Sequence, residues 1–321
     1  MSDNFRFNPR TLLLSAFWIK TLGVLGFLIP LQENGYLEEI DTYCGVSTGS
    51  LVSLLLILDM NVRDIISIII DLDILANVSN LFNCSTIFSQ KGIVDIDQFR
   101  KKLKSVVGSK LGSIPTLEGL KNFTGKSLVV HCLNIKTNEI EIFSPISHPN
   151  LSCVDAVINA INIPFIFKQH EDNNLIDSYF SNPYPIDYYD CGEQVLGITM
   201  KHKKERSELP FLINSNNISF FDNISKDKIR NLSLYFYELI VSTIEQKQNE
   251  NFSKVSNNCR TVEIPIKVCD PIGYSLEFDD RAEIIIDGYN IGQDYIDEKM
   301  VYIINRKRYK YDYPEYLLEE A

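Results

Sequence analysis

The sequence predicts an α/β protein, because strand-like and helix-like segments alternate along residues 11–200. Short apolar runs typical of buried strands precede longer apolar or amphipathic runs typical of helices. At residues 40–58, a strand-like run, a glycine-bracketed turn and an apolar helix-like run follow one another directly, which favours a β-α-β-α-β chain with a mainly parallel sheet. No segment repeats with a period of about 20 to 50 residues, which argues against solenoids and propellers.

The expected elements follow from local signals in chain order. Strands are expected at 12–15, 40–43, 128–135, 139–143, 175–177 and 195–200, where short apolar runs lie between turn residues. Helices are expected at 21–34, 50–58, 62–71, 97–107 and 154–162, where the apolar spacing is helical. The first of these helices ends at Gly35, a common stop signal, and the last ends before Pro164, because proline cannot continue a helix.

The composition changes after Met200, where a charge-rich loop begins. We therefore divide the chain into an N-terminal arm at 1–10, a main domain at 11–200 and a C-terminal extension at 201–321. Within the extension we expect a helix at 232–246, a strand at 262–268, a helix at 280–288 and a polar tail. No clear second core is visible there, so the extension is expected to pack on the first domain.

Residues 11–31 are apolar and about as long as a membrane span requires. Lys20 lies near the centre, where a charge costs about 2.5 to 3.5 kcal/mol on insertion scales. The segment also has no small-residue cleavage site and no strongly basic flank of the kind that a signal peptide carries. A buried strand followed by a buried helix is therefore favoured over a transmembrane or signal-anchor segment.

The composition excludes several classes of protein. The chain has 321 residues, of which 45% are hydrophobic and 23% charged, as in ordinary globular proteins. A formal net charge of -11 argues against a nucleic-acid partner, since neutralising phosphates requires a clustered basic surface. Seven cysteines without a C-x-x-C pair and four isolated histidines predict reduced thiols, no metal site and a cytoplasmic location.

One motif carries chemistry: Gly45, Val46, Ser47, Thr48 and Gly49 form a G-x-S-x-G pentapeptide between the second strand and the second helix. A nucleophile on a sharp strand-to-helix turn needs small flanking residues, so that the backbone folds back without clashes. The following helix adds a positive dipole end near the developing negative charge. Ser47 is therefore the candidate nucleophile of a serine hydrolase.

A serine nucleophile needs a base, which is often a histidine oriented by a carboxylate. No histidine lies in a recognisable triad setting. His131 falls within an expected strand and is interpreted as a packed core residue, whereas His170 lies in a polar turn and is interpreted as solvated. A carboxylate is the other candidate base.

From Leu12 to about Ile198 the sequence resembles the patatin-like phospholipase family. The resemblance rests on segments in the family's order: the loop Leu14–Thr21 and the helix after it, the elbow Gly45–Gly49, the segment Asp155–Phe167 (DAVINAINIPFIF), and the block Asp177–Pro185 (DSYFSNPYP). The residues around Pro185–Tyr189 and Asp287–Tyr289 are similar to patatin-like proteins of large DNA viruses.

The resemblance implies a three-layer α/β/α fold and a Ser-Asp dyad, with Ser47 as nucleophile and Asp177 as proton acceptor. It also implies a lipid or phospholipid ester as substrate and requires no metal or organic cofactor. Without the family, Asp177 is interpreted as a turn residue that caps the preceding strand.

The chain departs from the family pattern at two motifs. The glycine-rich oxyanion loop reads Ala16, Phe17 and Trp18, its last glycine is Thr21, and Lys20 keeps its basic position. Glycine serves there because the loop adopts restricted dihedrals close to the substrate oxygen. The two aromatic residues are expected to plug the pocket rather than to bind acyl chains. In the second motif, Ser178-Tyr179 replaces small residues after the aspartate, and we expect this replacement to disturb the dyad.

The sequence therefore leaves two alternative functions open. The first is a lipid acyl hydrolase of phospholipase A type that works through an acyl-enzyme. The second is a catalytically impaired relative with a structural or binding role, for example in a virion, in the host cytoplasm, at a membrane surface or with viral structural proteins. The intact elbow favours the first, and the altered loop favours the second.

Overall fold

The computed structural model describes most of the chain. It covers residues 7–16, 20–71, 94–164, 166–168, 174–202, 242–244, 246–266, 278–297, 302–304 and 307–309. The N-terminal arm up to residue 6, most of the expected helix at 232–246 and the last twelve residues lie outside the described residues. Among the described helices, none combines the length and the apolarity that crossing a bilayer requires.

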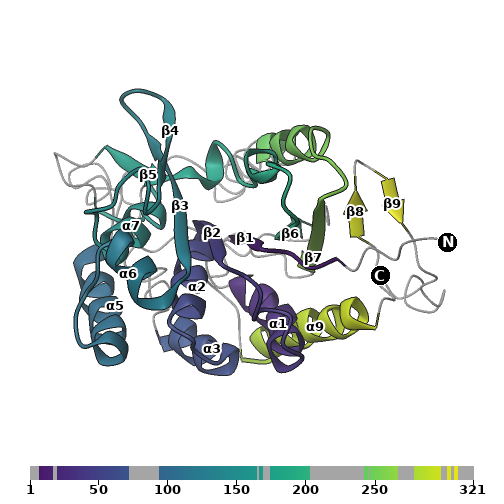
Figure 1. Cartoon of the computed structure of the whole chain (residues 1–321), viewed down its shortest axis with the longest axis horizontal. Helices are drawn as coiled ribbons and strands as arrows, with labels where there is room; N and C mark the ends of the chain where they lie inside the picture. The colour runs from purple at the N-terminus through teal and green to yellow at the C-terminus, as the bar shows by residue number, and fades with distance from the viewer. Residues whose placement is uncertain are drawn as a thin grey trace, which may run out of the picture.

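The described strands form a single mixed sheet, with β4-β3-β2-β1-β6-β7-β8-β9 as the order of neighbours (Figure 1). Its centre is parallel and consists of β3 (Ser127–Asn134), β2 (Thr42–Ser47), β1 (Thr11–Ala16), β6 (Val195–His202) and β7 (Cys259–Ile266). The outer strands are antiparallel: β4 (Glu139–Phe143), β5 (Leu175–Asp177), β8 (Tyr302–Ile304) and β9 (Lys307–Tyr309). Strand β1 lies in the middle because its residues are apolar on both faces, as in buried parallel strands.

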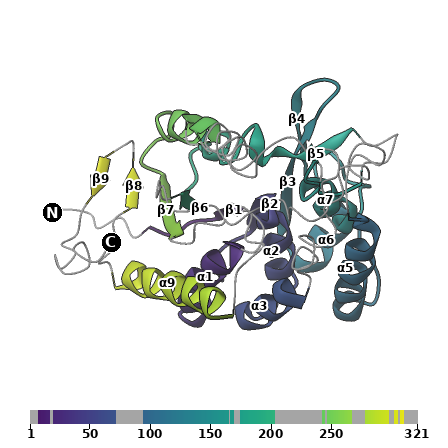
Figure 2. The same cartoon turned by 180° about the vertical axis from the view of Figure 1, so that it is seen from behind.

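Helices cover one face of the sheet in a continuous layer. These are α1 (Thr21–Glu33), α2 (Thr48–Ile57), α3 (Val62–Asp71), α5 (Ile96–Leu111), α6 (Leu117–Thr124), α7 (Cys153–Ala160) and α9 (Phe278–Ile296). Figures 1 and 2 show α1, α2, α3 and α9 on the same side of the strands. Helices α1 and α2 are almost entirely buried, which explains why they are apolar all round rather than amphipathic.

The opposite face carries a thinner layer, made of the 3₁₀ helix η4 (Ile186–Tyr189) and the helical residues 246–252. The 3₁₀ helix η3 (Ser178–Phe180) follows β5, and its Tyr179 joins the large cluster under the main helices. The side chains of β1 divide between the two layers. Leu12 and Leu14 join the large cluster under the helices, whereas Leu13 packs with Tyr184 and Phe252 on the other side. Helices on both faces of a mainly parallel sheet confirm the predicted three-layer α/β/α fold.

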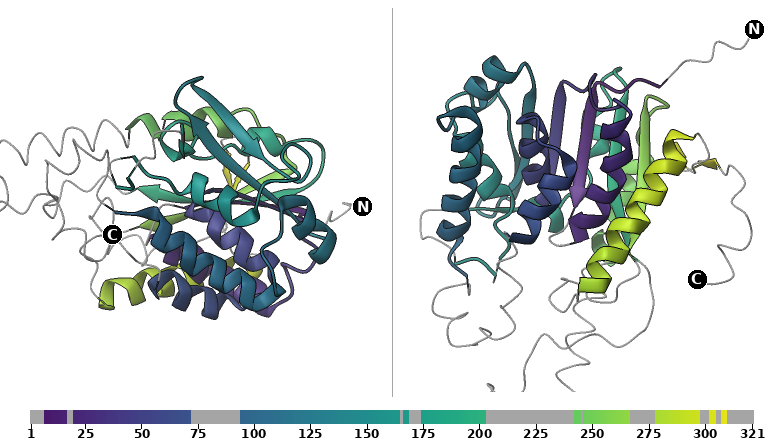
Figure 3. Two further views of the ribbon diagram at one scale, coloured as in Figure 1. Left: turned by 90° about the vertical axis from the view of Figure 1, so that its left-hand side faces the viewer. Right: turned by 90° about the horizontal axis from the view of Figure 1, so that it is seen from below.

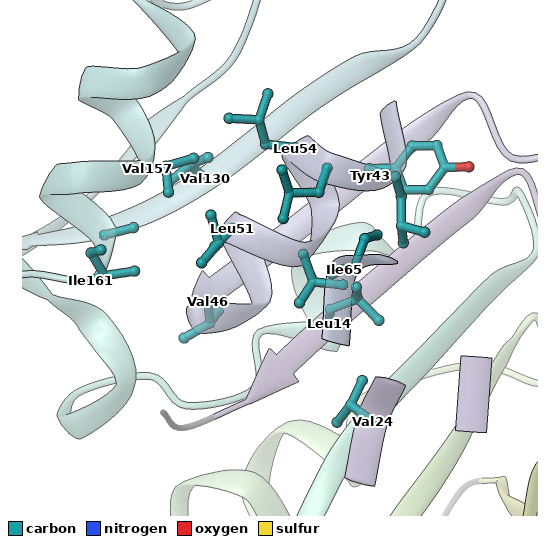
Figure 4. Packing of buried hydrophobic residues seen from close by; sticks show 14 of the residues in the cluster. Leu14, Val24, Tyr43, Val46, Leu51, Leu54, Ile65, Val130, Val157 and Ile161 are labelled. Atoms are coloured by element: carbon teal, nitrogen blue, oxygen red, sulfur yellow. The ribbon is translucent and has the colours of Figure 1, made fainter. Parts of the chain in front are cut away.

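The large core lies between the sheet and the main helical layer. Figure 4 shows side chains from several elements that meet there, among them Leu14 of β1, Val46 of β2, Leu51 of α2 and Val157 of α7. All four are buried. The elbow helix α2 is therefore fixed on several sides by apolar contacts.

The C-terminal part contributes to the same sheet and to the same helical layer. Strand β7 runs parallel to β6, and α9 lies along α1 (Figure 3, right). The two helices approach backbone to backbone: a Cβ at Gly26 would lie 2.2 Å from the Ile285 carbonyl oxygen, and a Cβ at Gly288 would lie 2.0 Å from the Gly23 carbonyl oxygen. Glycine is required at this crossing because any side chain would separate the helices.

Most expected elements appear within a few residues of the predicted bounds, and two differences have clear causes. Strand β2 continues to Ser47 instead of ending at Tyr43, because Gly45 is accommodated within the strand rather than in a turn. Helix α6 was not expected, since only Leu117 and Leu120 are buried on its single apolar face. Helix α9 is also longer than the predicted 280–288.

We expect Gly288→Ala to lower the free energy of unfolding by about 1–3 kcal/mol, because the added methyl group overlaps the backbone of α1. Urea unfolding followed by circular dichroism measures this change.

Gly108→Ala in α5 is the matched control, since the nearest atom to its added Cβ lies 3.8 Å away. Alanine should stabilise this helix position by about 0.5–1 kcal/mol. Equal effects of the two substitutions would contradict the close crossing of α1 and α9.

Candidate active site

Ser47 lies at the point where β2 turns into α2. Its backbone has φ 54° and ψ -134°, which places a residue with a side chain in the positive-φ region that usually requires glycine. Such conformations cost on the order of 1–3 kcal/mol and persist only where the surrounding structure enforces them. The turn directs Ser47 out of the sheet at the carboxyl end of the parallel strands.

The two glycines of the pentapeptide lie where backbones come into contact. A Cβ at Gly45 would lie 2.2 Å from the Cα of Ser50, and a Cβ at Gly49 would lie 2.1 Å from the Leu14 carbonyl oxygen. Both positions therefore exclude every other residue for steric reasons. The two glycines therefore let the helix fold back directly against the strands.

One edge of β3 brings Ser47 and Asp177 together. Strand β2 pairs with this edge up to Val46, opposite His131, and β5 pairs with the next stretch, where Asp177 lies opposite Cys132. The two strands therefore approach each other end to end along the same partner. The Ser47 hydroxyl donates a hydrogen bond to Asp177 Oδ2 at 2.5 Å, and both side chains are fully buried.

The Asp177 carboxylate has two hydrogen-bond donors and no exposure to solvent. Its Oδ1 accepts the backbone N–H of Tyr179 at 2.9 Å, so that Asp177 also caps the short helix η3. Burial raises the pKa of Asp177 from its ordinary value of 3.8 to about 7, and the bonds from Ser47 and Tyr179 partly oppose this rise. A carboxyl group with this pKa can accept a proton and return it near neutral pH.

Asn162 and Ser178 hold the short strand β5 in place. The Asn162 carbonyl accepts the Asp177 backbone N–H at 3.0 Å, and the Asn162 amide donates to the Leu175 carbonyl at 2.8 Å. The Ser178 hydroxyl donates to the His131 carbonyl at 3.0 Å. Ser178 and Tyr179 are both buried beside Asp177, and the expected effect of this altered motif on the dyad stays a prediction.

The first turns of α1 and α2 begin beside Ser47. In the sheet, Ala16 pairs with Ser47, and the buried Lys20 precedes α1. The hydroxyl groups of Thr21 and Thr48, the first residues of the two helices, lie 2.6 Å apart. The positive ends of two helix dipoles therefore face the region around the Ser47 side chain. Phe17 and Trp18 lie outside the described residues, so their predicted plugging of the pocket stays a prediction.

His131 is a packed core residue, as its position in an expected strand indicated. His131 is buried, its Nε2 lies 2.5 Å from the Tyr189 hydroxyl, and burial lowers its pKa to about 4. His170 lies outside the described residues. Within the described part of the chain, no three His, Cys, Asp or Glu residues are arranged to hold a metal ion.

Neither the role of Asn162 nor the bond between Thr21 and Thr48 was predicted from the sequence. A buried asparagine in the apolar run Ile161-Asn162-Ile163-Pro164 is a usable signal, since buried amides need hydrogen-bond partners. The threonine pair has no such signal, because it joins two helices that are separated by a strand.

Comparisons with known proteins agree with this architecture. The family model described as Patatin-like phospholipase matches residues 19–190, more than half of the chain. Two viral proteins are similar in sequence. "Uncharacterized protein R571" of Acanthamoeba polyphaga mimivirus is 26% identical over 267 residues, which is 78% of this chain and 86% of the relative. "Probable lipid hydrolase 463L" of Invertebrate iridescent virus 6 is 26% identical over 213 residues, which is 64% of this chain and 68% of the relative.

Among solved structures, VipD from Legionella pneumophila is similar with a TM-score of 0.51 and 14% sequence identity. The match covers 92% of this chain and 68% of VipD. At this identity the likeness concerns the fold alone. The viral relatives agree with the similarity to proteins of large DNA viruses noted in the sequence.

The raised pKa of Asp177 has a consequence for stability. Between pH values of about 4 and 7 the folded chain keeps a proton on Asp177 that the unfolded chain releases, so the contribution of this group to the free energy of unfolding falls as pH rises. His131, whose pKa is lowered to about 4, contributes in the opposite direction. The accumulated loss from Asp177 is on the order of 4 kcal/mol. We expect Asp177→Asn to remove this contribution. The free energy of unfolding of the variant, measured relative to that of the wild type, should therefore be higher at pH 8 than at pH 4.

Urea unfolding of both proteins across this pH range measures the difference. Ser47→Ala is the matched control, because it keeps the buried carboxyl group and should keep the fall. A constant difference between Asp177→Asn and wild type at all pH values would contradict the raised pKa.

Proposed function

Because the chain belongs to the patatin-like phospholipase family, we propose that it hydrolyses carboxylic esters of lipids, as a phospholipase A-type acyl hydrolase. Ser47 is the nucleophile and Asp177 is the proton acceptor. The observation that carries the proposal is the 2.5 Å hydrogen bond between these two buried side chains at a strained strand-to-helix turn. The description of the iridescent virus relative as a probable lipid hydrolase supports the same class of reaction.

In the first half of the reaction, the Asp177 carboxylate accepts the Ser47 proton while Oγ attacks the ester carbonyl carbon. The tetrahedral intermediate collapses, the bond to the leaving alcohol breaks, and the proton on Asp177 passes to the leaving oxygen. The products are a free alcohol, such as a lysolipid, and an acyl group on Ser47. Asp177 is then ionised again.

In the second half, Asp177 accepts a proton from water as the water oxygen attacks the acyl carbonyl carbon. The bond from Ser47 to the acyl group breaks, Oγ regains the proton, and a fatty acid leaves. A base with a pKa of about 7 suits both halves, since it holds the proton weakly enough to return it. No cofactor takes part in either half.

The negative charge on the carbonyl oxygen needs hydrogen-bond donors. The backbone N–H of Thr48 directly follows the nucleophile and begins α2, so the helix dipole adds to its effect. A second donor would come from the chain between β1 and α1, where the family has its glycine-rich loop. Loss of one donor typically lowers turnover by about 10²- to 10³-fold.

The substrate reaches Ser47 only after neighbouring side chains move aside, because Ser47 and Asp177 are fully buried. The net charge of -11 gives no electrostatic attraction to anionic lipids. We therefore assign the interaction with a lipid surface to apolar contacts. We place the reaction on membranes of the host cytoplasm, because the similar proteins come from viruses.

We expect a fluorophosphonate probe to label the wild type and not Ser47→Ala. Fatty acid release from mixed phospholipid vesicles should disappear in the same variant, because the acyl-enzyme cannot form. Ser53→Ala, which removes another buried serine hydroxyl of α2, is the control and should label like the wild type.

We also expect the labelling rate to rise with pH to a plateau, with a midpoint near 7, because only the ionised Asp177 accepts the proton. Failure of the wild type both to label and to release fatty acid would favour the second function: a catalytically impaired relative with a structural role, for example in a virion.

A further inference from the structure

Two buried threonine hydroxyls link the helices that begin beside the proposed nucleophile. Thr21 opens α1 and Thr48 opens α2, and their Oγ1 atoms lie 2.6 Å apart. Thr21 is fully buried and Thr48 is 4% exposed. The hydrogen bond therefore lies in the protein interior, where it is not weakened by competing solvent.

The bond acts on a turn that is fixed on its other sides. Gly49 packs against the Leu14 carbonyl of β1, and the Ser50 hydroxyl donates to the Ser47 carbonyl at 2.6 Å. The contact with Thr21 adds a constraint from α1, on the side of the turn next to Lys20. Together these contacts constrain the first turn of α2, whose Thr48 backbone N–H the proposed reaction uses for the carbonyl oxygen.

A purely structural explanation of this pair is weak. Two valines would fill the same volume and would bury no polar atoms, and replacing both partners of a hydrogen bond by apolar groups of the same shape is nearly neutral for stability. The surrounding core is apolar, with Leu22 and Leu51 fully or almost fully buried nearby in sequence. A hydroxyl pair at this place therefore points to the adjacent reaction rather than to packing.

We infer that Thr21 is a positioning residue for the proposed hydrolysis. Through Thr48 it fixes the oxyanion side of the site, at the position where the glycine-rich loop of the family would end. A glycine at residue 21 could not make this bond. The inference rests on the proposed function, since it assigns a role within that reaction.

The test compares Thr21→Val with Thr21→Ser. Valine keeps the shape and removes the hydroxyl, so we expect kcat and the rate of fluorophosphonate labelling to fall about 10- to 100-fold. KM and the pH midpoint near 7 should stay unchanged, because substrate binding and Asp177 are not altered. Serine retains the hydroxyl and should retain most of the wild-type rate.

Two further variants separate this role from a loss of folding. Ser53→Ala removes a buried hydroxyl of α2 that bonds the Cys44 carbonyl at 3.3 Å, away from the Thr21 contact, and should keep the wild-type rate. The double variant Thr21→Val/Thr48→Val removes both hydroxyls of the pair. We expect it to be no faster than Thr21→Val, because the constraint is lost in both.

Wild-type rates in Thr21→Val, or recovery of the rate in the double variant, would overturn the inference and leave the proposed function intact. A wild type that is not labelled at Ser47 would overturn the proposed function, and the inferred role of Thr21 with it. An equal loss of rate in Thr21→Ser and Thr21→Val would also overturn the inference.

Discussion

The site depends on one pairing constraint, which is that β2 and β5 share a single edge of β3. The two strands come from distant parts of the chain and run in opposite directions, yet each takes its register from the same partner. The carboxyl ends of β2 and β5 meet along this edge, so the side chain at the end of one strand meets the side chain at the end of the other. The contact between Ser47 and Asp177 is a consequence of strand register, and it needs no long or flexible loop.

This origin explains why the residues around the pair are polar in an otherwise apolar core. Asn162, Ser178 and the Tyr179 backbone supply or accept the hydrogen bonds that a three-residue strand cannot supply itself. The same burial that fixes the geometry also raises the pKa of Asp177 toward neutrality. In the proposed reaction, stability and reactivity therefore have opposite requirements at this carboxyl group, as is common in active sites.

Much of the fold could be predicted from the sequence, because local patterns specify local elements. The strand, turn and helix around Ser47 were visible in the spacing of two glycines and two apolar runs. The end of β2 was predicted too early, since Gly45 also occurs commonly in turns. The close approach of the Ser50 backbone, which is the actual reason for this glycine, is a tertiary feature.

The partner of Ser47 could not be derived in this way. Asp177 lies 130 residues away, and only the register on β3 places it opposite Cys132. The family resemblance supplied this residue, because a sequence pattern within one chain contains no information on strand register. The contact between Thr21 and Thr48 could not be predicted for the same reason. The plugging of the pocket by Phe17 and Trp18 stays a prediction from the sequence.

The crossing of α1 and α9 has a consequence for how the chain folds as it is synthesised. Helix α1 is apolar on nearly its whole surface, and its glycine-to-backbone contacts are made with α9, a helix near residue 288. Strand β1 likewise pairs on one side with β6, which comes much later in the chain. The close packing of α1 therefore depends on a contact of high sequence separation, which slows folding and leaves this apolar helix without its α9 partner until residue 288 has been synthesised.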